Sequence, residues 1–234
     1  MRGYWFALVA FVAATTTSCA FAENTGDTLT ACEDAEAQSA IKLCTEAITY
    51  GRLKGDDLAE AYYTRAGAYT KEQQYKQAES DYAAALRIRP DDAAILDARC
   101  EAYYNDHDYA NAIADCDQAI KLEPKYANAY MIRGNVYSDM GDDARAIQDY
   151  DQCIQLNPND EYSYFNRAIS HDKLGQYDLA IADYSEAIRL KTDFAAAYLN
   201  RSLVKRKLGD TAGADADLKK ARSLEPGIGM QTAT

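Results

Sequence analysis

The chain has 234 residues, of which 48% are hydrophobic and 26% charged, a composition typical of a folded protein rather than a disordered one. Its formal net charge of −12 at pH 7 repels phosphate backbones and anionic lipid head groups, which argues against nucleic acid as a partner. Only 4 prolines interrupt the chain, so long stretches are free to form helices.

Residues 1–22 have the three zones of a secretory signal peptide. Arg2 makes a basic start, an apolar run extends from Tyr4 to Ala14, and Ala20-Phe21-Ala22 supplies small residues for cleavage before Glu23. The apolar run is too short to span a bilayer comfortably, which disfavours a transmembrane anchor. We therefore expect an exported chain, with the periplasm as its compartment.

A second interpretation of the same segment stays open. Thr17-Ser18-Cys19 resembles a bacterial lipoprotein cleavage site, whose cysteine becomes the acylated N-terminus. In that case Cys19 would anchor the chain to a membrane through lipid.

Residues 23–58 are expected to form an N-terminal cap. The segment from 31 to about 50 resembles part of the repeat unit described below and has the pattern of that unit's second helix, and Gly51 to Gly55 adds an insertion before the first full copy. Cys32 and Cys44 bracket the start of this unit, and in an exported chain they are candidates for a disulfide. The helical pattern consists of Ala40, Ile41, Cys44, Ala47 and Ile48.

An internal repeat with a period of about 34 residues follows the cap. All four prolines fall on one grid of that period, at Pro90, Pro124, Pro158 and Pro226, and Thr192 stands at the one grid point without a proline. The period predicts a repeat array, which buries its core between neighbouring units. Five copies are predicted, over 59–92, 93–126, 127–160, 161–194 and 195–228, followed by a tail over 229–234.

Each copy is predicted to be a helical hairpin. In the third copy Tyr130, Gly134 and Tyr137 mark one helix, and Ala146 and Tyr150 belong to the second. The break between them is at 141–143, and the prolines end each second helix because their ring cannot continue it. The last copy has Asp215 and Arg222 where copies two to four have isoleucine, as a terminal unit with a solvent-exposed face requires.

These features resemble the tetratricopeptide repeat family. The resemblance rests on Tyr130, Gly134 and Tyr137, then Gly141, Ala146, Tyr150, Cys153 and Pro158, and covers about 170 of the 234 residues. It implies an all-α, right-handed superhelical solenoid of antiparallel helix hairpins with a concave face that binds other proteins. The chain departs from the family by carrying arginine where leucine is usual before the small residue of the first helix.

The repeated arginine has a partner at the same period. An aspartate recurs in the second helix of every copy, which suggests a structural ladder of bidentate, partly buried ion pairs. The ladder is expected to set the register of the helices. Its residues are Arg65, Arg99, Arg133, Arg167 and Arg201 with Asp81, Asp115, Asp149, Asp183 and Asp217.

The remaining cysteines and the histidines give little support to catalysis. Cys100 and Cys116 lie on facing helices of the second copy and are either a weaker disulfide candidate or small core residues, whereas Cys153 is expected to be a buried free thiol. His107 and His171 belong to no catalytic motif, and Cys100, His107 and Cys116 are too loosely spaced for a metal site. We therefore expect no enzyme activity, no metal and no cofactor.

The partner-binding residues are predicted on the exposed side of the first helices, which corresponds to the concave face of the family. A strip of aromatic and amide groups suits an extended peptide or a partner helix. Arg206 and Lys207, near the end of the groove, would favour an acidic segment. The predicted strip comprises Tyr63, Asp97, Glu101, Tyr104, Met131, Asn135, Tyr162, Phe165, Asn166, Leu199 and Asn200.

Three functional hypotheses follow. The first is an exported adaptor that organises other proteins of the cell envelope, and the second is a lipid-anchored form of the same adaptor. The third is an accessory of an envelope polysaccharide enzyme, in which groove tyrosines stack on sugars. The sequence leaves the identity of the partner and the oligomeric state open.

Overall fold

The computed structural model describes residues 25–50 and 52–229, and every regular element within them is a helix. The predicted signal peptide, its cleavage site before Glu23 and the lipidation candidate Cys19 lie outside these residues. None of the described helices is long and apolar enough to cross a membrane. The helices are α1 (Thr25–Glu33), α2 (Ala37–Tyr50), α3 (Gly55–Lys71), α4 (Tyr75–Ile88), α5 (Ala93–Asn105), α6 (Tyr109–Leu122), α7 (Ala127–Asp139), α8 (Asp143–Leu156), α9 (Glu161–Lys173), α10 (Tyr177–Leu190), α11 (Ala195–Lys207) and α12 (Thr211–Leu224).

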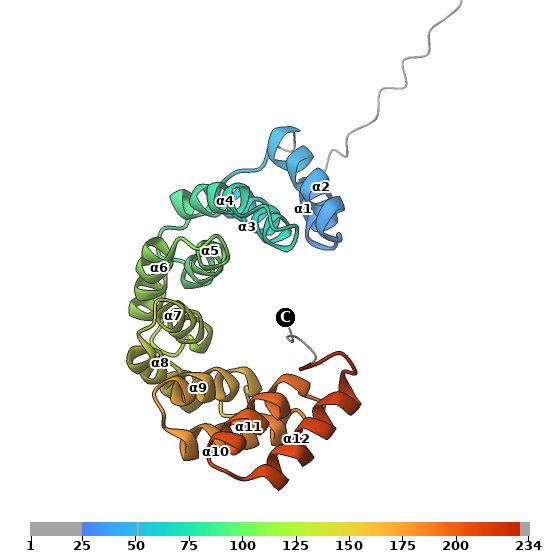
Figure 1. The fold of residues 1–234 in the computed structure, drawn as a ribbon. Helices are drawn as coiled ribbons and strands as arrows, with labels where there is room; N and C mark the ends of the chain where they lie inside the picture. The colour runs from blue at the N-terminus through green and yellow to red at the C-terminus, as the bar shows by residue number, and fades with distance from the viewer. Residues whose placement is uncertain (1–24, 51, 230–234) are drawn as a thin grey trace, which may run out of the picture.

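Consecutive helices pair as antiparallel hairpins that stack into an open crescent (Figure 1). The first helices of the hairpins, α3, α5, α7, α9 and α11, line the inner side of the curve, and α4, α6, α8 and α10 form its outer side. Each hairpin contacts the next one along the chain, and the buried apolar residues form clusters that are distributed along the crescent. The predicted all-α solenoid is confirmed.

The turn within each hairpin depends on one residue in the left-handed region. Gly141, Gly175 and Gly209 occupy it in the last three hairpins, with φ of 82°, 73° and 82°. Gln73 and His107 stand at the same place in the first two copies, with φ of 58° and 61°, although a side chain makes this conformation less favourable. The turn geometry is therefore kept by the packing of the hairpin and not by glycine alone.

The N-terminal segment contains more structure than the sequence indicated. The expected helix is α2, but α1 packs against it, so the segment forms a helix pair. Cys32 on α1 and Cys44 on α2 form a disulfide, with Cα atoms 5.0 Å apart. Since α1 carries few apolar residues, its helical pattern is weak, and packing on α2 and the disulfide compensate.

The Arg and Asp ladder joins the two helices of every repeat. In each pair the arginine donates two parallel hydrogen bonds, from Nε and Nη2, to the two carboxylate oxygens over 2.6 to 2.8 Å. In four of the five pairs the remaining nitrogen, Nη1, also reaches the second helix of the preceding hairpin. These additional bonds run from Arg65 to Thr45, Arg133 to Asp117, Arg167 to Asp151 and Arg201 to Ser185.

The other cysteines also have defined places. Cys100 on α5 and Cys116 on α6 form a second disulfide, with Cα atoms 5.6 Å apart. Cys153 is a buried free thiol, and its Sγ accepts a hydrogen bond of 3.0 Å from the Ser163 hydroxyl. Asp215 and Arg222 are exposed on α12, the last of the described helices, as expected for a terminal unit.

Candidate functional site

The inner face of the crescent is lined by recurring positions of the first helices. Tyr63, Met131, Phe165 and Leu199 occupy one of them and are half-buried. The ring of Tyr63 lies 5.9 Å from that of Tyr82, and Phe165 lies 5.7 Å from Tyr184 and 4.7 Å from Phe194. These predicted site residues therefore form the wall of the groove and also contribute to the core.

The centre of the inner face holds a pocket of about 190 Å³. It is lined by residues of three successive first helices and one second helix. Residues three or four apart on each helix share the face that lines the pocket. The predicted Tyr104, Asn135 and Asn166 are among them. The complete lining is Tyr104, Asn135, Ser138, Asp139, Tyr150, Asn166, Ile169 and Lys173.

Asn135 connects two of the other side chains of this pocket. Its side-chain oxygen accepts hydrogen bonds of 3.0 Å from the Asn166 amide and 2.8 Å from the Tyr150 hydroxyl. The amide nitrogen of Asn135 donates no hydrogen bond among the described residues, so it can donate to a ligand. Asn200, which is the repeat equivalent of Asn166, hydrogen-bonds the hydroxyl of Tyr184 farther along the groove.

Two polar side chains flank the pocket. Burial is the largest cause that raises the pKa of Tyr104 to about 12, and the charge of Asp139 and a hydrogen bond to its carboxylate add to the shift. Lys173 donates to the Ser138 hydroxyl over 2.9 Å and lies 3.3 Å from Asp143. Ser138 and Lys173 were missed from the sequence, although their spacing along the first helices is a signal that could have identified them.

A second exposed group lies farther along the inner face. Tyr162 is 46% exposed, and its ring lies 5.5 Å from that of Phe194. The Lys191 ammonium lies over both rings and bonds the Tyr162 hydroxyl over 2.8 Å. Tyr162 thus offers an apolar contact surface held in place by its neighbours.

The prediction that Asp97 belongs to the exposed strip is wrong. The sequence pattern placed it on the exposed side, but it is only 5% exposed, because α7 packs over this part of α5. Its Oδ2 accepts a 2.7 Å hydrogen bond from the Asn128 amide, and its Oδ1 has no hydrogen-bond partner among the described residues. Burial raises the pKa of Asp97 to about 6; the Asn128 bond opposes this shift and the charge of Glu101 adds to it. Glu101 is exposed, as predicted.

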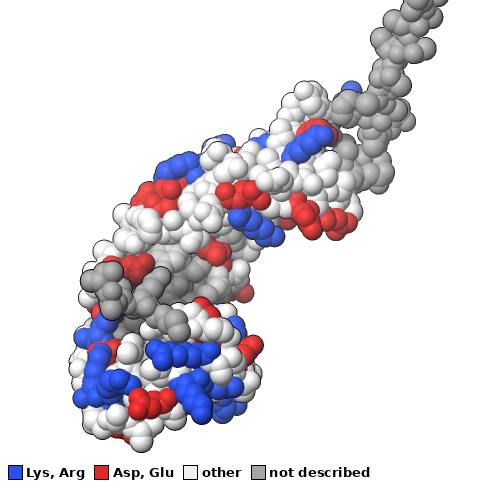
Figure 2. Space-filling model, turned by 45° about the vertical axis from the view of Figure 1, so that its right-hand side comes forward, with Lys and Arg blue, Asp and Glu red and all other residues white. Residues whose placement is uncertain are grey.

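The basic residues at the end of the groove are already paired. Arg206 bonds Asp215 over 2.7 Å, and Lys207 bonds Asp172 over 2.6 Å. Figure 2 shows Lys and Arg gathered at the C-terminal end of the molecule, over α11 and α12. Internal pairing weakens the expected preference of Arg206 and Lys207 for an acidic segment.

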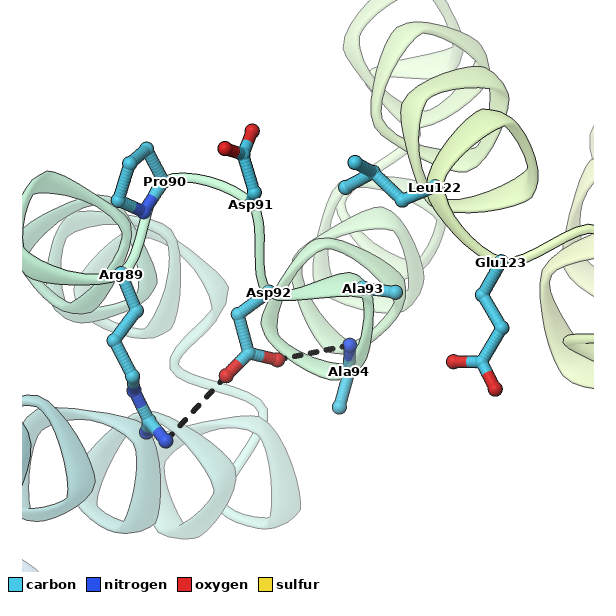
Figure 3. Close-up of a pocket in the computed structure, with 8 residues that line it drawn as sticks. All are labelled: Arg89, Pro90, Asp91, Asp92, Ala93, Ala94, Leu122 and Glu123. Atoms are coloured by element: carbon cyan, nitrogen blue, oxygen red, sulfur yellow. Dashed lines mark hydrogen bonds and ion pairs between the residues drawn. The ribbon is translucent and has the colours of Figure 1, made fainter.

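A larger notch of about 670 Å³ lies where α4 leads into α5 (Figure 3). Asp92 caps α5 by accepting from the backbone of Ala94 and also pairs with Arg89 over 3.4 Å. Pro90 and Leu122 stand on opposite sides of the opening. Because its charged groups stabilise the chain itself, the notch is a weaker ligand site than the central pocket despite its size.

Neither of the two histidines of the chain lines the central pocket. His171 is buried and shares a 2.6 Å hydrogen bond with Gln176, and His107 lies in a turn beside Tyr109. No group of three or more His, Cys, Asp or Glu residues in the described ranges is placed to hold a metal ion. The inner face provides tyrosine hydroxyls, amides and isolated charges, which suit hydrogen bonding to a polypeptide.

Comparison with known families agrees with the repeat grid. Models described as "Tetratricopeptide repeat" match residues 59–92, 127–160, 161–194 and 195–227. The chain belongs to the tetratricopeptide repeat family. No curated protein matches the sequence.

Solved structures of the same fold share little sequence with this tetratricopeptide repeat chain. A crystal structure of MamA is 23% identical with a TM-score of 0.64, covering 71% of this chain and 97% of MamA. MamA from Desulfovibrio magneticus RS-1 is 19% identical with a TM-score of 0.66, covering 73% and 97%. YrrB, described as a TPR protein with an unusual peptide-binding site, is 18% identical with a TM-score of 0.62, covering 81% and 95%. At these identities the similarity establishes the fold only.

Proposed function

We propose that this protein is a non-enzymatic scaffold of the cell envelope that binds a peptide segment or helix of a partner protein along its inner face. The observation that carries the proposal is the central pocket, where three successive first helices present Tyr104, Asn135, Asn166 and Lys173 to one space. Hydroxyl, amide and ammonium groups at the spacing of neighbouring helices suit the backbone and side chains of an extended segment. The peptide-binding site ascribed to YrrB lends support by analogy of fold.

The proposed location outside the cytosol has its own support. Two disulfides in a chain of this size are typical of an oxidising compartment, since cytosolic reductants keep thiols reduced. The signal-peptide pattern of residues 1–22 points the same way. Intact mass of the protein recovered from cells tests this part, because cleavage before Glu23 and acylation at Cys19 give different masses.

Site-specific photo-crosslinking in intact cells tests the binding surface. A photoreactive amino acid is placed on the inner face at Glu101 or Tyr162 and, as a control, on the outer face at Gln118 or Gln155, all of which are exposed. We expect crosslinks to a discrete protein from the inner positions only. Crosslinks from the outer positions alone would place the binding site on the outer face. A product carrying carbohydrate instead of protein would favour the glycan-binding alternative.

A matched set of alanine variants supplies the second readout. Glu101→Ala, Tyr162→Ala and Leu203→Ala remove exposed inner side chains, Leu203 being at the repeat position of Glu101, whereas Gln118→Ala, Lys121→Ala and Gln155→Ala remove outer ones. Tyr63 and Phe165 are left intact, because their rings pack on Tyr82 and Tyr184 and their loss would disturb the fold. The inner triple variant should lose capture of the partner with an unchanged melting temperature. Equal capture by both triple variants would reject the groove.

A further inference from the structure

Asp97 stands apart from every other buried aspartate of the described chain. Six more aspartates are buried there, and each has a basic partner: five pair with the ladder arginines, and Asp143 lies 3.3 Å from the Lys173 ammonium. Within the same residues Asp97 has only the neutral amide of Asn128, and its Oδ1 is buried without a partner. An ionised group in this state is unfavourable unless something outside the chain compensates.

The residues at the same repeat position in the other copies show how unusual Asp97 is. Tyr63, Met131, Phe165 and Leu199 occupy the same position in the other four copies, and all of them are apolar or aromatic. An apolar side chain at Asp97 would therefore fit the packing pattern between successive first helices. A residue that breaks such a local rule without an internal gain marks a place where function outweighs stability.

A second uncompensated acid lies one helical turn farther on the same face. Glu101 is exposed at the surface of the inner face, four residues after Asp97, and forms no ion pair within residues 25–50 and 52–229. Like charges at this spacing destabilise a helix. The two carboxylates thus place negative charge on α5 that no ion pair within the described residues neutralises.

Tyrosines surround this charge. Burial is the largest cause of a raised pKa at both Tyr63 and Tyr126, and the carboxylate of Asp97 contributes to the shift at each phenol. Tyr63 comes from α3 and Tyr126 precedes α7, so the carboxylate lies between three successive hairpins. Phenol rings next to carboxylates favour a cation, because the ring faces carry partial negative charge.

We propose that Asp97 and Glu101 form a subsite for a lysine or arginine side chain of the partner segment, an inference that rests on the proposed function of the groove. Glu101 bonds the cationic group directly at the surface. Asp97, shielded from water, acts through its charge over one helical turn, where the low-dielectric surroundings strengthen the attraction. The charge of the bound cation in turn offsets part of the cost of the ionised Asp97.

Selection of peptides from a random library displayed on phage tests the subsite. The purified protein is compared with the variant Asp97→Asn/Glu101→Gln and with a matched control, Asp91→Asn/Glu123→Gln, which removes the same charge from exposed positions outside the inner face. Wild type and the control should both select peptides that share a lysine or arginine at one position. The subsite variant should select peptides without that preference and bind the wild-type consensus peptide about tenfold more weakly.

Each other outcome overturns the proposal in a distinguishable way. If the control variant loses the basic preference as well, general attraction to an acidic protein explains it. If all three proteins select the same peptides without a basic residue, the subsite is wrong and the groove proposal stands. If no protein selects peptides above the level of the inner triple alanine variant, the proposed function fails together with the subsite. Circular dichroism and melting temperature confirm that every variant is folded.

Discussion

Arg133 on α7 and Asp149 on α8 are joined by two parallel hydrogen bonds, of 2.8 Å from Nε and 2.6 Å from Nη2. Both side chains are largely buried, at 19% and 7% exposure. The Nη1 of Arg133 donates to Asp117 of the preceding hairpin. The same guanidinium therefore holds one hairpin together and attaches it to the hairpin before it, which keeps the first helices in register along the groove.

Arg133→Met tests the ladder. Removing one partner leaves the Asp149 carboxylate buried and unpaired, and the expected loss of stability is about 3 to 5 kcal/mol. Thermal unfolding followed by circular dichroism measures it. The double variant Arg133→Met/Asp149→Leu should recover much of the loss, because two apolar side chains replace the pair. An unchanged melting temperature in the single variant would show that the pair does not stabilise the array.

Gly134→Ala tests the close approach of two helices. A Cβ at this position would lie 2.8 Å from the ring of Tyr150, which is almost fully buried and cannot move aside. We expect a destabilisation of about 1 to 3 kcal/mol. Gly67→Ala is the matched control, since the nearest atom there is 3.8 Å away and alanine favours the helix by about 1 kcal/mol. A stabilised Gly134→Ala variant would contradict the packing.

Asp97→Asn tests the cost of the unpaired carboxylate. The pKa of Asp97 is about 6 in the folded chain against an ordinary value of 3.8, so the folded state binds the proton more tightly than the unfolded state. The free energy of unfolding therefore decreases as the pH rises from about 4 to about 6, the range in which Asp97 loses its proton. At pH 7 the asparagine variant should be more stable by about 3 kcal/mol. The difference in melting temperature should shrink towards pH 4, and a difference independent of pH would contradict the assignment.

The disulfide between Cys100 and Cys116 should stabilise the second hairpin. A closed loop of this length is worth about 3 kcal/mol, mainly by restricting the unfolded chain. The variant Cys100→Ala/Cys116→Ala should melt at a lower temperature than the oxidised wild type. Addition of a reductant should lower its melting temperature less than that of the wild type, because only the bond between Cys32 and Cys44 remains to be broken. Equal sensitivity of both proteins to reductant would indicate that Cys100 and Cys116 are not paired.

The hairpins and their order could be predicted from the amino-acid sequence. The repeat period of about 34 residues places apolar and small residues at helical spacing within each copy, and local spacing is enough to define a helix and its end. Recurrence at the same period also paired each arginine with its aspartate, and the concave face followed from the family resemblance. The helix α1 was not predicted, because its residues carry little apolar periodicity of their own.

The way neighbouring hairpins meet is a property of the folded molecule. The bonds from the ladder arginines to the preceding hairpin, the lining of the central pocket and the burial of Asp97 all depend on the angle at which one hairpin packs on the next. That angle results from the summed fit of many side chains across the interface, which no spacing within a single repeat encodes. For this reason the fold was predictable from residue spacing, whereas Asp97, the one buried aspartate of the described residues without a basic partner, became apparent only in the tertiary structure.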